Sequence, residues 1–209
     1  MRLSIVDINL ERGPSEGCRA IEASFQRLHP GIEITHQHWS DLDELTPERL
    51  VLGPNGTPFP AYPDEFQSFL SKVRHYQGPL LGICGGHQVL GLAHGASVGP
   101  VHDLPPASIS YAGMPKVEGA VTIRVVEAHH PLMLKIDPLF SLSASHVDEL
   151  KSLPQHFTLL ATNEVSRVQV MARRGLLQVG IQCHPERPLG DVHGETLLGR
   201  WLELSSSAT

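Results

Sequence analysis

The chain has 209 residues and a net charge of −6, from 22 acidic and 16 basic side chains. A hydrophobic fraction of 41% with 18% charged residues excludes a disordered chain and suits a single globular domain over residues 1–209. No cluster of lysine and arginine favours a nucleic-acid partner, and no apolar run approaches the ~20 residues of a membrane helix.

Cysteine usage and the N-terminus predict a cytoplasmic location. Cys18, Cys84 and Cys183 are too few and too scattered for a disulfide framework. Asp7 lies where the apolar region of a signal peptide would be. We therefore expect a cytoplasmic protein with reduced thiols.

Expected elements alternate in the first half of the chain. Short apolar runs predict buried strands, and amphipathic stretches bounded by caps, glycine or proline predict helices. In chain order we expect a strand at 3–8, a helix at 15–28 capped by Ser15, strands at 32–39 and 50–52, a Gly/Pro-rich loop at 53–58, a helix at 62–75, a strand ending at 80–81, and a helix at 89–93.

The second half begins with an irregular connection at 99–119, which is either functional or a simple insertion. Strands are then expected at 121–126, 139–142, 157–161, 167–172 and 176–181, followed by a helix at 194–204 and a frayed tail at 205–209. This order predicts an α/β fold with a largely parallel sheet and a small antiparallel extension. In such sheets the functional site lies at the carboxyl ends of the strands.

A candidate nucleophile lies between an expected strand and an expected helix. Gly82-Ile83-Cys84-Gly85-Gly86 has the spacing of a nucleophile elbow, G-x-S-x-G, with cysteine in place of serine. The sharp turn leaves no room for side chains at the flanking glycines. It also places Cys84 at a helix N-terminus, where free N–H groups favour a thiolate and can hold an oxyanion.

A base and its orienting group follow about a hundred residues later. His184 and Glu186 come directly after an expected strand, and residues i and i+2 of an extended chain point the same way. A carboxylate beside an imidazole fixes its tautomer and stabilises the imidazolium. Cys84, His184 and Glu186 are therefore a candidate nucleophile, base and orienter.

The motifs 82–88 (GICGGHQ) and 182–186 (QCHPE) resemble those of the class I, or triad, glutamine amidotransferases. Two weaker blocks, 52–58 (LGPNGTP) and 144–149 (ASHVDE), are similar to the glutamine-binding loop and to a Ser-His-x-Asp segment of the GMP-synthetase type. The order and spacing match over about residues 1–200, which implies a flavodoxin-like sheet flanked by helices.

The resemblance implies that Cys84 attacks the side-chain carbonyl of glutamine and forms a thioester, with no cofactor and no metal. It also implies a set of oxyanion and substrate-binding residues, namely Gly53, Asn55, Gly56, Gly85, Gln88, Ser145, His146 and Val147. Many family members carry a larger residue where this chain has Gly85, so we expect a less filled or reshaped pocket rim. Cys183 stands where an aromatic residue is common.

Three functions remain open at this stage. The leading one is a glutaminase that supplies ammonia to a separate synthase; a stand-alone γ-glutamyl hydrolase and a non-catalytic regulatory protein on the same fold are the alternatives. We interpret His87 as structural, Cys183 as a core-packing residue, and Cys18 as a helix residue without a chemical role. His36 and His38 share a strand face, but without a third ligand they are interpreted as polar strand positions and not as a metal site.

Overall fold

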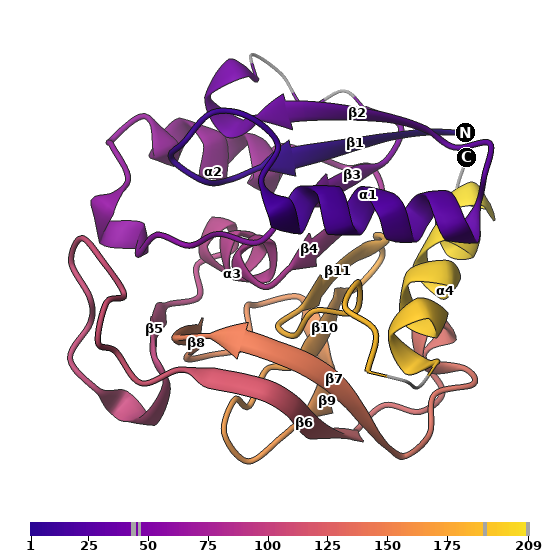
Figure 1. The fold of residues 1–209 in the computed structure, drawn as a ribbon. Coiled ribbons are helices and arrows are strands. Elements are labelled where there is room, and N and C mark those ends of the chain that lie inside the picture. Colours follow the sequence, from indigo (N-terminus) through magenta and orange to yellow (C-terminus); the bar gives the residue numbers. More distant parts are fainter. Residues whose placement is uncertain (43–44, 46, 190–191, 208–209) are drawn as a thin grey trace.

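Nine strands form one sheet in the part of the chain that the computed structural model describes, residues 1–42, 45, 47–189 and 192–207 (Figure 1). They lie across the sheet in the order β2-β1-β3-β4-β11-β10-β9-β6-β7. Their bounds are β1 Arg2–Asp7, β2 Glu33–His38, β3 Leu50–Leu52, β4 Leu80–Ile83, β6 Val117–Val125, β7 Leu139–His146, β9 Phe157–Thr162, β10 Val170–Arg173 and β11 Gln178–Ile181. A separate antiparallel pair consists of β5 (Val98–Pro100) and β8 (Asp148–Leu150).

The sheet changes direction at β11. Strands β2, β1, β3, β4 and β11 pair in parallel. Strands β10, β9, β6 and β7 continue from β11 with antiparallel pairing. The expected fold class, a parallel sheet with helices and an antiparallel extension, is confirmed.

Two pairs of helices cover the two faces of the sheet (Figure 1). Helices α1 (Glu16–Leu28) and α4 (His193–Ser207) contribute to one apolar cluster, and α2 (Phe66–His75) and α3 (Gly85–Ala93) to the other. Strand β1 contributes side chains to both clusters, because successive residues point to opposite faces of the sheet: Leu3 and Ile5 belong to the first cluster and Val6 to the second. None of the described helices is both long and apolar enough to cross a membrane.

The register of the parallel strands brings three loops together. Leu52 of β3 pairs with Gly82 of β4, and Gly82 pairs with Gly180 of β11. Parallel neighbours end at the same edge, so the 53–58 loop, Cys84 and the segment after Ile181 leave the sheet side by side.

One helix starts later than the sequence predicts. The expected helix at 62–75 begins at Phe66, after a short 3₁₀ turn at Phe59–Ala61. Tyr62 is extended, with φ −76° and ψ 144°, because the proline at position 63 disfavours the helical conformation in the residue before it.

The C-terminal segment does not fray where the sequence predicts it. Helix α4 continues through Ser207, and Ser205 is fully buried. The Arg49 guanidinium donates to the Ser205 hydroxyl at 2.8 Å and to its carbonyl at 3.1 Å, which anchors this end of α4 beside β3. The expectation was therefore wrong for 205–207, and 208–209 lie outside the described residues.

Candidate active site

Cys84 occupies a strained turn between β4 and α3. Its backbone has φ 52° and ψ −104°, a left-handed value of φ that non-glycine residues seldom adopt. The turn is held from both sides, since the Cys84 N–H donates to the Ile181 carbonyl at 2.8 Å and the Cys84 carbonyl accepts from the Gln88 N–H at 3.1 Å. These are the features of a nucleophile elbow.

Close backbone approach explains the glycines around this turn. A Cβ atom on Gly82 would overlap the Gly86 carbonyl, and a Cβ atom on Gly86 would overlap the Leu52 carbonyl. A side chain at either position would push α3 away from β3 and β4. The elbow thus depends on the glycine spacing that the sequence shows.

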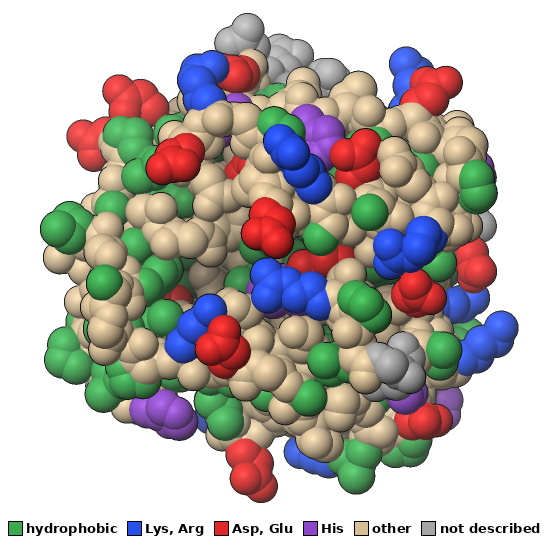
Figure 2. Space-filling view, viewed as in Figure 1, with side chains coloured by type: hydrophobic (Ala, Val, Ile, Leu, Met, Phe, Trp, Pro, Cys, Tyr) green, Lys and Arg blue, Asp and Glu red, His purple; other side chains and the backbone are tan. Residues whose placement is uncertain are grey.

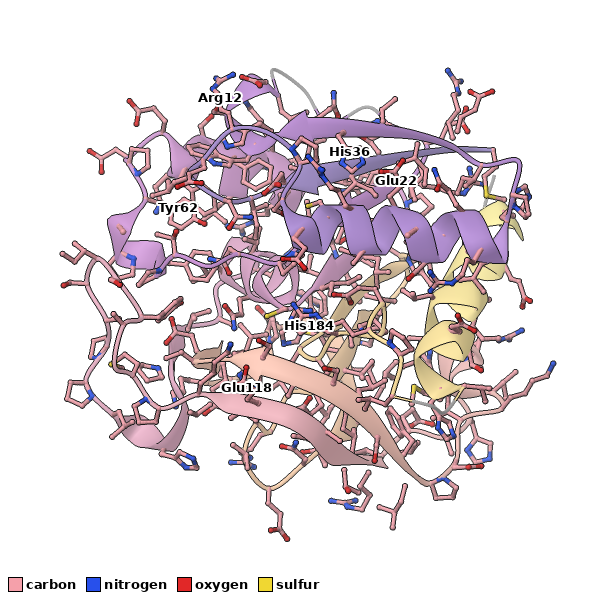
Figure 3. The ribbon with its side chains drawn as sticks, in the orientation of Figure 1. Arg12, Glu22, His36, Tyr62, Glu118 and His184 are labelled. Carbon is pink, nitrogen blue, oxygen red and sulfur yellow. The ribbon has the colours of Figure 1, made fainter. Side chains whose placement is uncertain are left out.

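His184 and Glu186 extend from the segment after β11 toward the elbow. The His184 Nδ1 atom lies 2.7 Å from Glu186 Oε1, and both side chains are almost fully buried. The His184 N–H donates to the Ser143 carbonyl of β7 at 2.8 Å, and Ser24 of α1 donates to the Glu186 carbonyl at 3.3 Å. Figure 3 shows His184 between α1 and β7.

The charge state of His184 follows from its neighbours. Burial acts to lower the pKa of His184, but the Cys84 sulfur and the Glu186 carboxylate outweigh it and raise the pKa to about 10. The His184 Nε2 atom is buried and makes no hydrogen bond to the described residues, and the Cys84 sulfur is the neighbour that contributes most to raising the pKa of the ring. The arrangement favours an imidazolium beside the sulfur, ready to give a proton to a leaving group.

A cavity of about 900 Å³ opens beside Cys84. Charged side chains of both signs surround the hollowed centre of this face (Figure 2). The cavity is lined by residues from the ends of the strands, from the start of α1 and from the long connection, namely Asn9, Ser15, Glu16, Gly17, Ala20, Pro54, Asn55, Gly56, Cys84, Gln88, Tyr111, Met114, Lys116, Ser145, His146, Val147, Asp148, His184 and Arg187.

The backbone of Asn55 faces Gly85 across the elbow. A Cβ atom on Gly85 would lie 2.7 Å from the Asn55 nitrogen and would overlap the Asn55 side chain. Of the two expected forms of the rim, less filled or reshaped, the structure shows the second, because Asn55 occupies the space that a larger residue at 85 would need. The N–H groups of Asn55 and Gly85 are the two candidate oxyanion donors.

Gly53 and Gly56 have other roles than the expected oxyanion contact. The Gly53 N–H donates to the Val6 carbonyl at 3.0 Å, and Gly53 does not line the cavity but packs against the Cys18 sulfur. The Gly56 N–H donates to the Asn9 side chain at 3.0 Å. Both N–H groups are engaged, so these residues shape the loop and do not supply donors.

The segment 145–147 lies against the cavity, as expected for a substrate-binding segment. The Ser145 carbonyl is 3.9 Å from the Cys84 sulfur. The His146 ring contacts the Asp148 carbonyl at 3.0 Å, and burial lowers its pKa to about 4, so the ring is neutral. Gln88 donates to the same Asp148 carbonyl at 2.6 Å, which ties α3 to this segment.

Sequence reasoning missed several residues of the site. Gln182 lies within the recognised motif, and its amide Nε2 is 3.9 Å from the Cys84 sulfur and its Oε1 accepts from Gln88 at 3.2 Å. Asn9 follows β1 and holds the loop through Gly56 and the Pro54 carbonyl. The position of Asn9 at the carboxyl end of a parallel strand was a usable signal.

The connection at 99–119 reaches the cavity. The sequence alone did not decide whether this connection is functional or a simple insertion. Tyr111, Met114 and Lys116 line the cavity, and the Tyr111 hydroxyl donates to Asp148 Oδ2 at 2.6 Å. Asp148 Oδ1 is buried without a hydrogen-bond partner among the described residues. No local pattern in 99–119 pairs Tyr111 with Asp148, since their contact depends on the tertiary fold.

Three other histidines have local partners or packing roles. Burial lowers the pKa of His87 to about 3, and its ring packs against Gly180 of β11. His36 faces Glu22 at 2.9 Å (Figure 3), and His38 contacts the Asn9 carbonyl at 2.8 Å. Within the described ranges no group of three histidine, cysteine or acidic side chains is placed to hold a metal ion.

An electrophilic glutamine analogue is expected to alkylate Cys84 and to spare the other two cysteines. Burial raises the pKa of Cys18 to about 12 and raises the pKa of Cys183 as well, and neither lines the cavity. Peptide mapping by mass spectrometry after stoichiometric labelling measures this. Modification of Cys18 or Cys183 in the folded chain would contradict the assignment of the nucleophile.

Comparisons with known proteins agree with this geometry. The family model for glutamine amidotransferase class-I matches residues 19–202. The chain is 31% identical over 172 residues to aminodeoxychorismate synthase component 2 of Serratia marcescens, covering 78% of this chain and 80% of the relative. It is 32% identical over 148 residues to a glutamine-hydrolyzing GMP synthase component of Methanothermobacter thermautotrophicus, covering 69% of this chain and 70% of the relative.

A solved structure shows the same fold. The glutamine amidotransferase of Methylobacillus flagellatus superposes with a TM-score of 0.68 at 17% identity, covering 96% of this chain and 94% of that one. With the family model spanning most of the sequence, the chain belongs to the class I glutamine amidotransferases, a family of cysteine-dependent enzymes that hydrolyse glutamine.

Proposed function

We propose that Cys84, His184 and Glu186 hydrolyse the side-chain amide of glutamine and that the released ammonia passes to a separate synthase. The observation that carries the proposal is the buried His184–Glu186 pair, 2.7 Å apart, beside a strained cysteine that lines a cavity. The relatives are amidotransferase components of two different synthases, which supports a component role and leaves the ammonia acceptor open.

The proposed reaction has two halves. The Cys84 sulfur attacks the amide carbon, and the carbonyl electrons move onto the oxygen, which the N–H groups of Asn55 and Gly85 stabilise. The C–N bond then breaks as His184 gives its proton to the nitrogen, which releases ammonia and leaves a γ-glutamyl thioester. Water attacks the thioester and His184 accepts the water proton. The C–S bond then breaks, which releases glutamate and restores the Cys84 sulfur as a thiolate beside the His184 imidazolium.

Asp148 is suited to the amino-acid end of the substrate. A buried carboxylate with one unpaired oxygen is unfavourable, and an ammonium group supplies donors for it. The Asp148 carbonyl is linked through Gln88 to the first turn of α3, next to Cys84. This arrangement directs the γ-glutamyl part toward Asp148 and Tyr111.

A cytoplasmic location is part of the proposal. The chain has three free cysteines, all buried, and a thiol nucleophile has to stay reduced.

We expect weak glutaminase activity from the isolated chain and a rise in kcat when the synthase and its substrate are present. The physical reason is that the cavity is bounded by a Gly/Pro-rich loop and by the 99–119 connection, whose arrangement a docked partner can change. A steady-state assay of glutamate release, with and without the ammonia-using components of both synthase types, measures it. Limited proteolysis should show 99–119 protected by the cognate partner.

The control is the Cys84→Ala chain mixed with the same synthase and an ammonium salt, which tests the synthase without glutamine hydrolysis. Full-speed hydrolysis by the isolated chain, unchanged by any synthase, would contradict the coupled function and favour a stand-alone γ-glutamyl hydrolase. If the chain hydrolyses no glutamine and the glutamine analogue does not alkylate Cys84, the result would instead favour a non-catalytic regulatory protein on this fold.

A further inference from the structure

We propose that the cavity also accepts γ-glutamyl amides of amino acids, with Arg187 binding the carboxylate of the leaving amino acid. This second activity rests on the same proposed thioester chemistry at Cys84 but uses a larger substrate than glutamine. Three features support it: the position of Arg187 relative to the base, the size of the cavity, and the unengaged donors of the guanidinium.

The leaving group of any amide hydrolysed here lies on the His184 side of the cavity. His184 protonates the departing nitrogen, whereas Asp148 and Tyr111 are placed for the γ-glutamyl part. A group attached to the leaving nitrogen therefore extends past His184, away from Asp148.

Arg187 lines the cavity and follows His184 within one turn of the chain. It directly follows the triad, and its N–H donates to the His184 carbonyl at 3.1 Å, which closes a turn. The side chain lines the cavity and is 43% exposed, with Nε 3.8 Å from Glu186 Oε1. Its terminal nitrogens make no hydrogen bond to any residue that the structure describes, so the planar fork is available for a carboxylate.

The cavity has room for such a substrate. Its volume of about 900 Å³ is at the upper end of the roughly 300–1,000 Å³ of pockets that hold drug-sized ligands, which are much larger than glutamine. A cavity of this volume can hold a γ-glutamyl dipeptide, which is larger than glutamine.

Glu16 is expected to disfavour an anionic leaving group. It lies at the start of α1 and lines the same cavity, and its exposed carboxylate would repel a carboxylate on the leaving group. Removing the charge of Arg187 should therefore weaken the preference for a leaving group with a carboxylate, and removing the charge of Glu16 should strengthen it.

In the proposed reaction the Cys84 sulfur bonds to the γ-carbonyl carbon, and the bond from that carbon to the amino-acid nitrogen breaks. His184 gives its proton to this nitrogen, and the free amino acid leaves. Water then hydrolyses the thioester to glutamate, so no co-reactant other than water is needed.

The test compares γ-glutamylglycine with γ-glutamylmethylamide, which differ only by the carboxylate of the leaving amine. We expect kcat/KM to favour γ-glutamylglycine by about 10-fold, the lower end expected for a charge-assisted hydrogen bond, since Arg187 is partly exposed. In Arg187→Met the ratio should fall to about 1, in Arg187→Lys it should be intermediate, and in Glu16→Gln it should rise. Arg19→Met removes an arginine of α1 that does not line the cavity, and should leave the ratio unchanged.

Glutamine hydrolysis by each variant is measured in parallel to normalise for the state of the triad. If glutamine is hydrolysed but neither amide is, or if Arg187→Met keeps the parental ratio, the inference is overturned and the proposed glutaminase function stands. If glutamine is not hydrolysed either, the proposed function itself fails. If Arg187→Met has no cooperative melting transition and is therefore not folded, the Glu16→Gln variant provides the test. A kcat/KM ratio of the two amides that is unchanged in Glu16→Gln would also overturn the inference.

Discussion

Replacing Cys84 with alanine is expected to lower glutamine hydrolysis by at least about 10⁴-fold, which corresponds to about 5.5 kcal/mol of transition-state stabilisation. The reason is that the sulfur is the atom that bonds to the substrate, and no other cysteine lines the cavity. Cys84→Ser should lose activity as well, because the hydroxyl lacks the reactivity of the thiolate. Glutamate release over several hours, measured enzymatically, gives the residual rate.

Cys183→Ser is the matched control for this prediction. Cys183 is fully buried, does not line the cavity, and donates to Gln169 Oε1 at 3.2 Å. We expect this variant to keep most of its activity. Residual activity of Cys84→Ala within tenfold of the parent, or its loss in Cys183→Ser with an intact fold, would show that Cys84 is not the nucleophile.

Removing the base, His184, should lower kcat nearly as much as removing Cys84, and weakening its orienting group, Glu186, should lower kcat less. We expect His184→Ala to lose about 10⁴-fold in kcat, and Glu186→Gln to lose about 10²-fold, because the amide still contacts the ring but no longer carries the charge. The Glu186 carboxylate contributes to the raised pKa of His184. Without it, His184 loses its proton at lower pH, so the alkaline limb of the kcat profile should move to lower pH in Glu186→Gln.

Glu164→Gln serves as the control for the charge change, since Glu164 is exposed and does not line the cavity. A pH–rate profile from pH 5 to 11 on the parent and both glutamate variants separates orientation from a general electrostatic effect. Parental activity with an unmoved alkaline limb in Glu186→Gln would remove Glu186 from the triad.

The sequence was sufficient for the elbow and for the order of most elements. The glycine spacing around Cys84 predicts a sharp turn with no room for side chains, and the structure shows the close backbone contacts that require glycine there. A short apolar run located β1, which is buried on both faces of the sheet. Patterns of period 2 and period 3.6 located β2 and α1, which each bury one face. The capping role of Ser15 was also correct, since its hydroxyl accepts from the Cys18 N–H.

Contacts between distant segments escaped prediction. The start of α2 is not such a case, because Pro63 is next to Tyr62 and its effect can be read from the sequence. The order of Ser205, in contrast, depends on Arg49, which is 156 positions away in sequence. Tyr111 meets Asp148 only because the 99–119 connection folds back over the strand ends. Local composition marks such a connection as irregular, but it contains no information about what the connection touches.

The backbone of Cys84 has a consequence for protein engineering. A non-glycine residue held at φ 52° costs of the order of 1–3 kcal/mol, a sizeable part of the roughly 5–15 kcal/mol by which a domain of this kind is stable. Glycine would relieve that strain, so heat resistance and turnover place opposite demands on position 84. A screen for thermostable variants that scores only melting temperature will accept substitutions here that inactivate the enzyme, and the screen therefore has to score turnover in the same round.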